Sequence, residues 1–227
     1  KTRILESKKL NILMIDDHPS MIEGYKSILS FNDLDCEISV EPAYNCESAY
    51  YLIAENQNES AYDVVFIDLS LPAFPEQKIY SGHDLARLVR SYMPTTKIII
   101  LTSHIEAFLL YKIHREIEPE GFLVKSDFSA QELLSAFNQI VGGEKYKSRT
   151  VQQNINEVMA NDFLLDEYYQ QIITLLAQGI KTKNMPEHIN ITLSAIDKRK
   201  AHIKEFFNIE KGSDEDIIKE AKKRGLI

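Results

Sequence analysis

The sequence of 227 residues contains no tryptophan, only two cysteines, and no apolar run near the roughly 20 residues that a membrane-spanning helix needs. Cys36 and Cys46 do not have the spacing of metal ligands, so we expect both thiols to be reduced, as in the cytoplasm. The charged first nine residues precede no apolar stretch of signal-peptide type, so we expect no secretory signal. The sequence therefore predicts a cytoplasmic protein without a membrane partner.

Two further absences argue against two kinds of binding site. The sequence has no glycine-rich phosphate-binding loop and no cluster of cysteine and histidine residues, so it supports neither a nucleotide site nor a zinc site. Its composition, 44% hydrophobic and 26% charged, is typical of a globular protein. A chain of this length can bury a core and form one large or two ordinary domains.

Charge is distributed unevenly along the chain, whose formal net charge is −8. Residues 1–141 hold 12 Lys and Arg against 21 Asp and Glu, whereas residues 164–227 hold 11 against 10. An acidic front part and a near-neutral, locally basic tail predict two domains with different tasks.

Short apolar runs alternate with amphipathic helical patterns over the acidic part of the chain. The expected strands cover residues 10–15, 37–42, 64–68, 97–101 and 121–124. Each is followed by a helical pattern, and Asn45 and Ser129 stand where two of these helices need an N-cap. Regular alternation of this kind predicts a parallel sheet with helices on both faces.

Polar side chains follow four of these strands. Asp16 and Asp17 follow the first, Asp68 ends the third, Thr102 follows the fourth and Lys125 follows the fifth. The carboxyl ends of parallel strands share one edge of the sheet, where open α/β sheets place their ligands. Three carboxylates that converge repel one another unless a cation such as Mg²⁺ neutralises them. With a lysine and a hydroxyl nearby, the set predicts phosphoryl transfer to a carboxylate.

The tail is expected to be entirely helical from about residue 164, after a polar segment that we interpret as a linker with a helix near residues 151–159. Four helices are expected, the third capped by Thr192 and the fourth by Ser213. The third helix carries a basic run, and a basic helix in the major groove is a common way to contact DNA phosphates. The candidate DNA-binding residues are Lys183, Lys198, Arg199, Lys200 and Lys204.

The pattern of Asp16, Asp17, Asp68, Thr102 and Lys125 after the strands resembles the receiver domain of bacterial two-component response regulators. The resemblance covers residues 10–141 and includes Leu-x-Leu-Pro after Asp68 and Gly82 before the third helix. It implies that Asp68 accepts a phosphoryl group from a histidine kinase. It also implies the following supporting residues: Asp17, Asp68 and the backbone carbonyl of Ser70 as ligands of Mg²⁺, Asp16 as a ligand through water, Thr102 and Lys125 at the phosphoryl group, and Phe122 as the switch aromatic. An ordinary core aromatic is the alternative interpretation of Phe122.

The tail resembles the LuxR-type helix-turn-helix of the NarL/FixJ response regulators. The resemblance rests on Leu175–Gly179, on Ile196 and Ile203 of the basic helix, and on the final Arg-Gly-Leu-Ile. The sequence departs from the family at Pro186, where the family continues its scaffold helix, and at an acidic residue, Asp197, where many members are basic.

We therefore predict an α/β fold with a doubly wound, five-stranded parallel sheet of the flavodoxin-like receiver type, followed by a smaller all-α domain. The expected parts are a receiver at 8–141, a linker at 142–163 and a helix-turn-helix domain at 164–227. The resemblance implies a phosphorylation-dependent transcription regulator that binds double-stranded DNA and forms a homodimer when active. It implies no enzyme activity beyond phosphorylation and dephosphorylation of Asp68 itself.

Three alternatives stay open at the level of the sequence. A haloacid-dehalogenase-like phosphatase would also use Asp68 as a nucleophile, but it needs a second Asp where this chain has Ser70. A receiver whose tail binds protein rather than DNA would fit Pro186 and Asp197. A dimer that forms without control by phosphorylation would also have this sequence pattern.

Overall fold

The computed structural model describes residues 8–34, 36–56, 61–160, 166–209 and 212–227. The described residues form two compact units. The first contains the chain up to His104 together with Ile113–Gln152, and the second contains Ile105–Lys112 together with Gln153–Ile227. Within the described ranges, no helix has the length and apolar character that crossing a bilayer requires.

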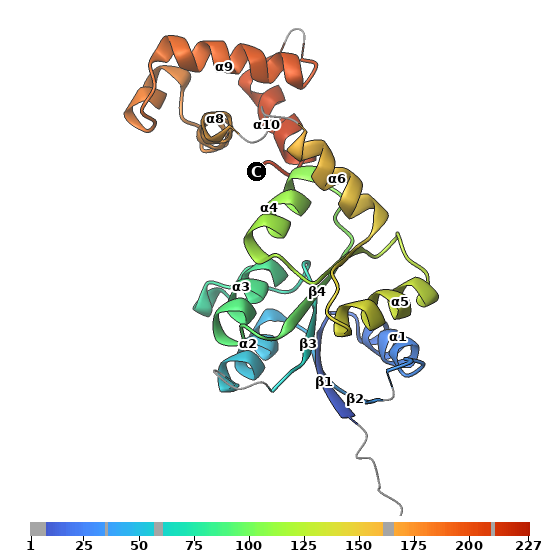
Figure 1. Cartoon of the computed structure of the whole chain (residues 1–227). Helices are drawn as coiled ribbons and strands as arrows, with labels where there is room; N and C mark the ends of the chain where they lie inside the picture. Colours follow the sequence, from blue (N-terminus) through green and yellow to red (C-terminus); the bar gives the residue numbers. More distant parts are fainter. Residues whose placement is uncertain (1–7, 35, 57–60, 161–165, 210–211) are drawn as a thin grey trace, which may run out of the picture. The chain divides into compact units, whose positions relative to one another are not determined.

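A parallel sheet forms the centre of the first unit, with the strand order β2-β1-β3-β4-β5-β6 (Figure 1). The strands are β1 (Lys8–Ile15), β2 (Cys36–Ala43), β3 (Val64–Asp68), β4 (Lys97–Thr102), β5 (Gly121–Val124) and β6 (Tyr146–Lys147). The order reverses between β1 and β3, and the crevice at such a reversal is where doubly wound sheets bind ligands. The doubly wound parallel sheet predicted from the sequence is confirmed.

The predicted number of strands was one too low. The sixth strand, β6, has only two residues and lies in the segment that we interpreted as a linker. It pairs in parallel with β5, and Ser148 Oγ then accepts a hydrogen bond of 3.1 Å from the backbone N–H of Val124. Two residues are too few to show the alternation that marks a strand, so only the pairing with β5 reveals it.

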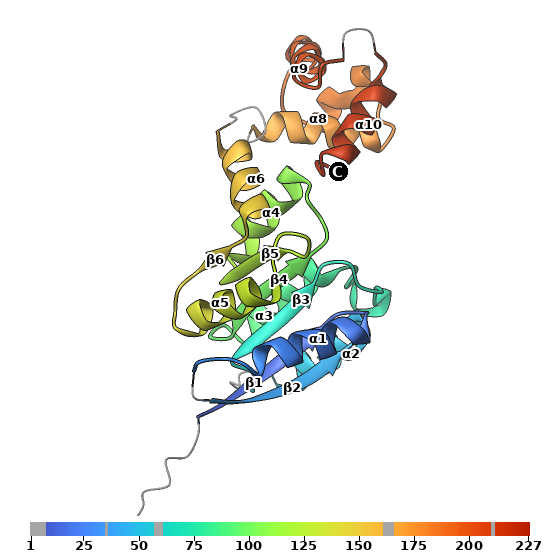
Figure 2. The same ribbon diagram turned by 90° about the vertical axis from the view of Figure 1, so that its right-hand side faces the viewer.

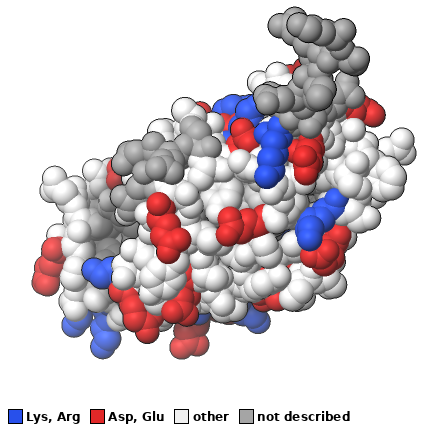
Figure 3. Space-filling view, turned by 90° about the horizontal axis from the view of Figure 1, so that it is seen from below, with Lys and Arg blue, Asp and Glu red and all other residues white. Residues whose placement is uncertain are grey.

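Helices cover both faces of the sheet (Figures 1 and 2). The helices of this unit are α1 (Pro19–Leu29), α2 (Cys46–Glu55), η1 (Pro75–Gln77), α3 (Gly82–Tyr92) and α5 (Ala130–Val141). Two more helices, α4 (Ala107–Ile117) and α6 (Arg149–Met159), are divided between the two units. Helices α1 and α5 lie on one face, where Phe66 of β3 and Phe137 of α5 stack with ring centroids 6.2 Å apart. Helices α2 and α3 lie on the other face. Side chains of both signs are interspersed on the surface at which the strands begin (Figure 3).

The helix caps expected from the sequence are present. Asn45 Oδ1 accepts a hydrogen bond of 2.8 Å from the N–H of Ser48 at the start of α2. Ser129 and Glu132 form a reciprocal capping box at the start of α5. These side chains satisfy backbone N–H groups that a helix terminus leaves without partners.

The second unit is helical. Besides its parts of α4 and α6, it contains α8 (Glu167–Ala177), η2 (Thr182–Glu187), α9 (Leu193–Phe206) and α10 (Asp214–Lys223). Its core includes apolar side chains from α8, η2, α9 and α10, among them Ile172, Leu176, Met185, Ile196, Ile203 and Ile217. Thr192 caps α9 by accepting a hydrogen bond of 3.3 Å from the N–H of Ala195.

The second of the four expected helices is a short 3₁₀ helix, η2, with Pro186 inside it. Proline has no N–H to donate and its ring collides with the carbonyl four residues earlier, so it disfavours a longer α-helix. Pro186 therefore restricts this element to a few residues.

Gly82 fixes the distance between the start of α3 and the end of β3. A Cβ atom at this position would lie 1.8 Å from the carbonyl oxygen of Asp68 and 2.8 Å from its carbonyl carbon. The N–H of Gly82 also donates a hydrogen bond of 3.1 Å to the carbonyl oxygen of Leu69. Only glycine allows this approach, and the approach holds the backbone at Asp68 in place.

We predict that Gly82→Ala destabilises the protein by about 3 kcal/mol, because the added methyl group overpacks against backbone that cannot rotate away. The matched control is Gly24→Ala in α1, where an added Cβ meets nothing within 4 Å. This control should stabilise the protein by about 0.5–1 kcal/mol, since alanine is the better helix former. Urea unfolding measures both changes, and equal effects of the two substitutions would contradict the structure.

Candidate functional site

The register of the sheet brings the acidic residues to one edge. Ile15 of β1 lies opposite Ile67 of β3, so Asp16 and Asp68 follow at neighbouring strand ends. Both carboxylates are buried, Asp16 being 3% exposed and Asp68 5% exposed. Two buried like charges side by side are unfavourable without a partner of opposite charge.

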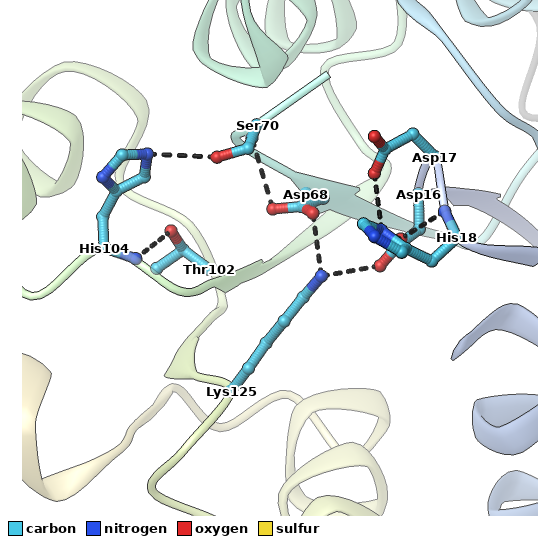
Figure 4. Close-up of polar contacts among 8 residues, drawn as sticks. All are labelled: Asp16, Asp17, His18, Asp68, Ser70, Thr102, His104 and Lys125. Atoms are coloured by element: carbon cyan, nitrogen blue, oxygen red, sulfur yellow. Dashed lines mark hydrogen bonds and ion pairs between the residues drawn. The ribbon is translucent and has the colours of Figure 1, made fainter. Parts of the chain in front are cut away.

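Lys125 provides that partner. Thr102 of β4 pairs with Val124 of β5, so Lys125 leaves the sheet at the same edge. Its ammonium group donates hydrogen bonds of 2.8 Å to Asp16 Oδ2 and of 2.8 Å to Asp68 Oδ2 (Figure 4). Burial acts to lower the pKa of Lys125, but its hydrogen bonds and charge interactions with the two carboxylates outweigh burial and raise that pKa. The lysine is therefore charged at neutral pH and links the two strand ends.

The third carboxylate, Asp17, is partly exposed beside this pair. Its Oδ1 atom is buried and accepts no well-aligned hydrogen bond from the described residues, although His18 Nδ1 lies 2.7 Å away. Asp16, Asp17 and His18 can bring one ligand atom each within 4.8 Å of one another. Lys125 contacts two of the three carboxylates and leaves Asp17 beside His18, so an oxygen-ligated divalent cation such as Mg²⁺ fits this donor set.

Two residues that the sequence did not single out in these roles, Ser70 and His104, contact predicted site residues. Ser70 Oγ and His104 Nε2 are 3.1 Å apart, and the backbone N–H of Ser70 donates to Asp68 Oδ1 at 3.3 Å (Figure 4). The backbone N–H of His104 donates to Thr102 Oγ1 at 3.0 Å. Ser70 and His104 each stand two residues after a predicted site residue, and that spacing was the available signal.

Phe122 of β5 is fully buried in the first unit. It stands three residues before Lys125, as its predicted role as a switch aromatic requires. Full burial is equally the property of a core aromatic, so the role stays a prediction.

The candidate DNA-binding residues fall into two groups. Lys183 of η2 and Lys198 of α9 are exposed. Arg199, Lys200 and Lys204 are instead engaged within the second unit. The Arg199 guanidinium lies over the rings of Tyr168 and Tyr169, at 5.2 Å and 5.5 Å from their centroids.

The two engaged lysines act as internal ties. Lys200 Nζ donates to Thr182 Oγ1 at 2.6 Å and forms an ion pair of 2.7 Å with Asp214, and its side chain is only 14% exposed. Lys204 Nζ donates to the carbonyl oxygen of Gly212 at 2.6 Å. Charge committed to such contacts is less available to phosphate. Of the five candidates, Lys183 and Lys198 are the exposed ones, and DNA binding by any of them stays a prediction.

A doubly wound sheet with a buried Asp–Lys–Asp arrangement at its switch point, followed by a compact helical unit, defines a receiver-type signalling protein. Residues 12–138 match the family described as the response regulator receiver domain. The chain belongs to the response regulator receiver family.

Relatives and solved structures agree with this assignment. The oxygen regulatory protein NreC of Staphylococcus carnosus (strain TM300) is 26% identical over 230 residues, which cover 96% of this chain and 99% of NreC. A LuxR-family response regulator from Aurantimonas sp. SI85-9A1 is 27% identical with a TM-score of 0.55, and the match covers 68% of this chain and 100% of that one. The predicted resemblance to NarL/FixJ-type two-component response regulators is confirmed.

The fold extends to RcsB from Salmonella enterica serovar Typhimurium. Its solved structure gives a TM-score of 0.64 at 19% identity and covers 93% of this chain and 97% of RcsB. The predicted arrangement of an α/β receiver followed by a smaller helical unit is therefore confirmed at the level of the fold.

We predict that Lys125→Met destabilises the protein by about 3 kcal/mol at neutral pH, because it leaves two buried carboxylates without their shared cation. Since the folded pKa of Lys125 is raised, this stabilisation is fully present below its usual value of 10.5 and is lost only as the pH rises through the higher folded value. Urea unfolding over a pH series measures the effect.

The matched control is Lys26→Met. Lys26 forms a more exposed ion pair of 2.9 Å with Glu23 inside α1. Exposed pairs contribute little, so this change should remain within about 1 kcal/mol. Equal stability of Lys125→Met and wild type at neutral pH would show that the ion pairs of Lys125 do not hold the strand ends together.

Proposed function

We propose that this response regulator is phosphorylated on Asp68 by a histidine kinase. The observation that supports this most directly is the position of Lys125 Nζ, 2.8 Å from Asp16 and 2.8 Å from Asp68. An ammonium group placed there can move to an oxygen of an incoming phosphoryl group without leaving the site. The buried Thr102 hydroxyl stands on the adjacent strand end and can approach the same oxygens.

Each residue then has a defined task. A carboxylate oxygen of Asp68 attacks phosphorus as the bond to the donor breaks. Mg²⁺, when bound, supplies positive charge that offsets the negative charge of the phosphoryl oxygens. Asp17, Asp68 and the backbone carbonyl of Ser70 would hold the ion, with Asp16 acting through water. Phe122 and Thr102 would report the phosphorylated state to the rest of the receiver.

The second unit is proposed to act as the output. We retain residues 8–141 as the receiver, 142–163 as the linker and 164–227 as the helix-turn-helix domain. RcsB dimers have been solved bound to DNA, and RcsB shares this fold. By that likeness, phosphorylation would shift the receiver between two states and promote a homodimer that binds double-stranded DNA and regulates transcription.

We predict that acetyl phosphate and Mg²⁺ add one phosphoryl group to the wild-type protein and none to Asp68→Asn. Intact mass measures the modification, and size-exclusion chromatography measures assembly. The matched control is Asp63→Asn, because Asp63 is exposed, precedes the same strand and accepts a hydrogen bond from Asn11 at the opposite end of the sheet. Asp63→Asn should be modified like the wild type. Modification that persists in Asp68→Asn would refute the assigned phosphoacceptor.

A second candidate function is supported by the contacts of α9. Three of its four candidate basic residues are used inside the unit, and the exposed residues of α9 include Asp197 and Glu205. Such a surface suits a protein partner better than a phosphate backbone. Substitution of two neighbouring α9 residues of opposite charge, Asp197 and Lys198, distinguishes protein binding from DNA binding.

We predict that Lys198→Ala weakens binding to double-stranded DNA by about threefold to tenfold and that Asp197→Ala strengthens it by a similar factor, because each alters the charge facing phosphate by one unit. Lys222→Ala on α10 should leave affinity unchanged. Fluorescence anisotropy with DNA selected by the full chain from a random library measures all three. If the full chain selects no DNA, or if Lys198→Ala and Asp197→Ala have no effect, the output surface of α9 is a protein-binding one.

A further inference from the structure

Tyr25 of α1 places a hydroxyl group beneath the acidic site. Its side chain is only 5% exposed, and its hydroxyl oxygen is buried without a hydrogen-bond partner among the described residues. A buried hydroxyl without a partner costs about 1–3 kcal/mol, so an orphan of this kind calls for an explanation. An apolar side chain of the same size would fill the position without that cost.

A small cavity lies next to this hydroxyl. Its volume is about 10 Å³, and Tyr25, Asp16 and Asp68 line it together with apolar residues that include Met14, Phe66 and Leu101. That volume is close to the minimum that holds one water molecule, and a buried water needs two to four polar partners. The three polar residues that line the cavity, Tyr25, Asp16 and Asp68, carry one hydroxyl and two carboxylates.

The hydroxyl remains a donor at neutral pH. The pKa of Tyr25 is raised to about 12, chiefly by burial and also by the charges of Asp16 and Asp68, although the charge of Lys125 acts to lower it. A protonated hydroxyl can donate to a water, and that water then has two hydrogens for two carboxylates. The donors and acceptors of the three groups therefore match.

We propose that Tyr25 is a positioning residue that holds one buried water beneath the acidic site, and that this water donates hydrogen bonds to the carboxylates of Asp16 and Asp68. The inference rests on the proposed function, in which Asp68 is the phosphoacceptor. It adds a group that approaches Asp68 from inside the protein, opposite to the phosphodonor.

The water would influence phosphoryl transfer in both directions. In phosphorylation, an Asp68 oxygen forms a bond to phosphorus while the bond from phosphorus to acetate breaks, and acetate leaves with the electron pair. In hydrolysis, a solvent water forms the new bond to phosphorus and loses a proton to solvent, while the electron pair of the broken bond returns to Asp68. A hydrogen bond to Asp68 is stronger when Asp68 is a charged carboxylate than when it is an acyl phosphate. It therefore slows the first reaction and speeds the second.

Tyr25→Phe tests this, because it removes one oxygen atom and retains the ring. We expect phosphorylation by acetyl phosphate to become about threefold to tenfold faster at saturating donor and hydrolysis of the acyl phosphate to become slower by a similar factor. The donor concentration at half saturation should not change. Mass spectrometry over time measures both reactions. Tyr92→Phe, at the last residue of α3, is the matched control and should leave both rates unchanged.

Changes in opposite directions distinguish a hydrogen bond to Asp68 from general loosening of the packing. Unchanged rates, or two rates that rise or fall together, would overturn the inference.

A double-mutant cycle keeps the test independent of phosphorylation. Tyr25→Phe changes the equilibrium constant for urea unfolding by some factor in the wild type. In the Asp68→Asn background, that factor should be at least about threefold smaller. Additive effects in the cycle would also overturn it.

The two proposals can fail separately. If the wild type is not phosphorylated on Asp68, the proposed function fails, and the double-mutant cycle still decides whether Tyr25 and Asp68 are coupled. If the wild type is phosphorylated and Tyr25→Phe behaves like Tyr92→Phe, the proposed function stands and the role of Tyr25 fails.

Discussion

The repulsion between carboxylates at one edge of the sheet is the constraint on which the rest of the first unit depends. Asp16 and Asp68 are buried side by side, and the ammonium group of Lys125 offsets both charges at 2.8 Å. Breaking such an arrangement leaves buried charge uncompensated, which costs several kcal/mol. The proposed phosphorylation would act on this same arrangement, because a phosphoryl group on Asp68 would compete with the carboxylates for the one lysine. Under that proposal, stability and signalling would use the same three side chains.

The backbone around this site is held by packing rather than by further charge. Gly82 brings the start of α3 so close to the carbonyl group of Asp68 that no side chain fits between them. Tyr25 of α1 lines the cavity on the inner side of the same carboxylate. Residues of helices on both faces of the sheet, Gly82 of α3 and Tyr25 of α1, therefore lie close to the phosphoacceptor candidate.

The second unit shows why a charge run in a sequence is a weak predictor of a binding surface. Arg199, Lys200 and Lys204 fall in one basic stretch, but each contacts a neighbour in the fold. Arg199 lies over two tyrosine rings, Lys200 contacts Asp214 and Thr182, and Lys204 donates to a backbone carbonyl. Lys198 belongs to the same stretch and is exposed. Which face of α9 each residue occupies separates the two groups.

The sequence by itself determined the parallel sheet, because buried strands and amphipathic helices have local periodicities. It also determined that Asp16, Asp68, Thr102 and Lys125 stand at one edge of that sheet, because each directly follows or ends a strand. It also determined the caps at Asn45 and Ser129, whose partners lie three residues away. Only the tertiary structure decided the pairing of β6, the contact of Ser70 with His104 and the approach of Tyr25 to the acidic site. Each of these joins groups that are far apart in the chain, and no local pattern encodes such a distance.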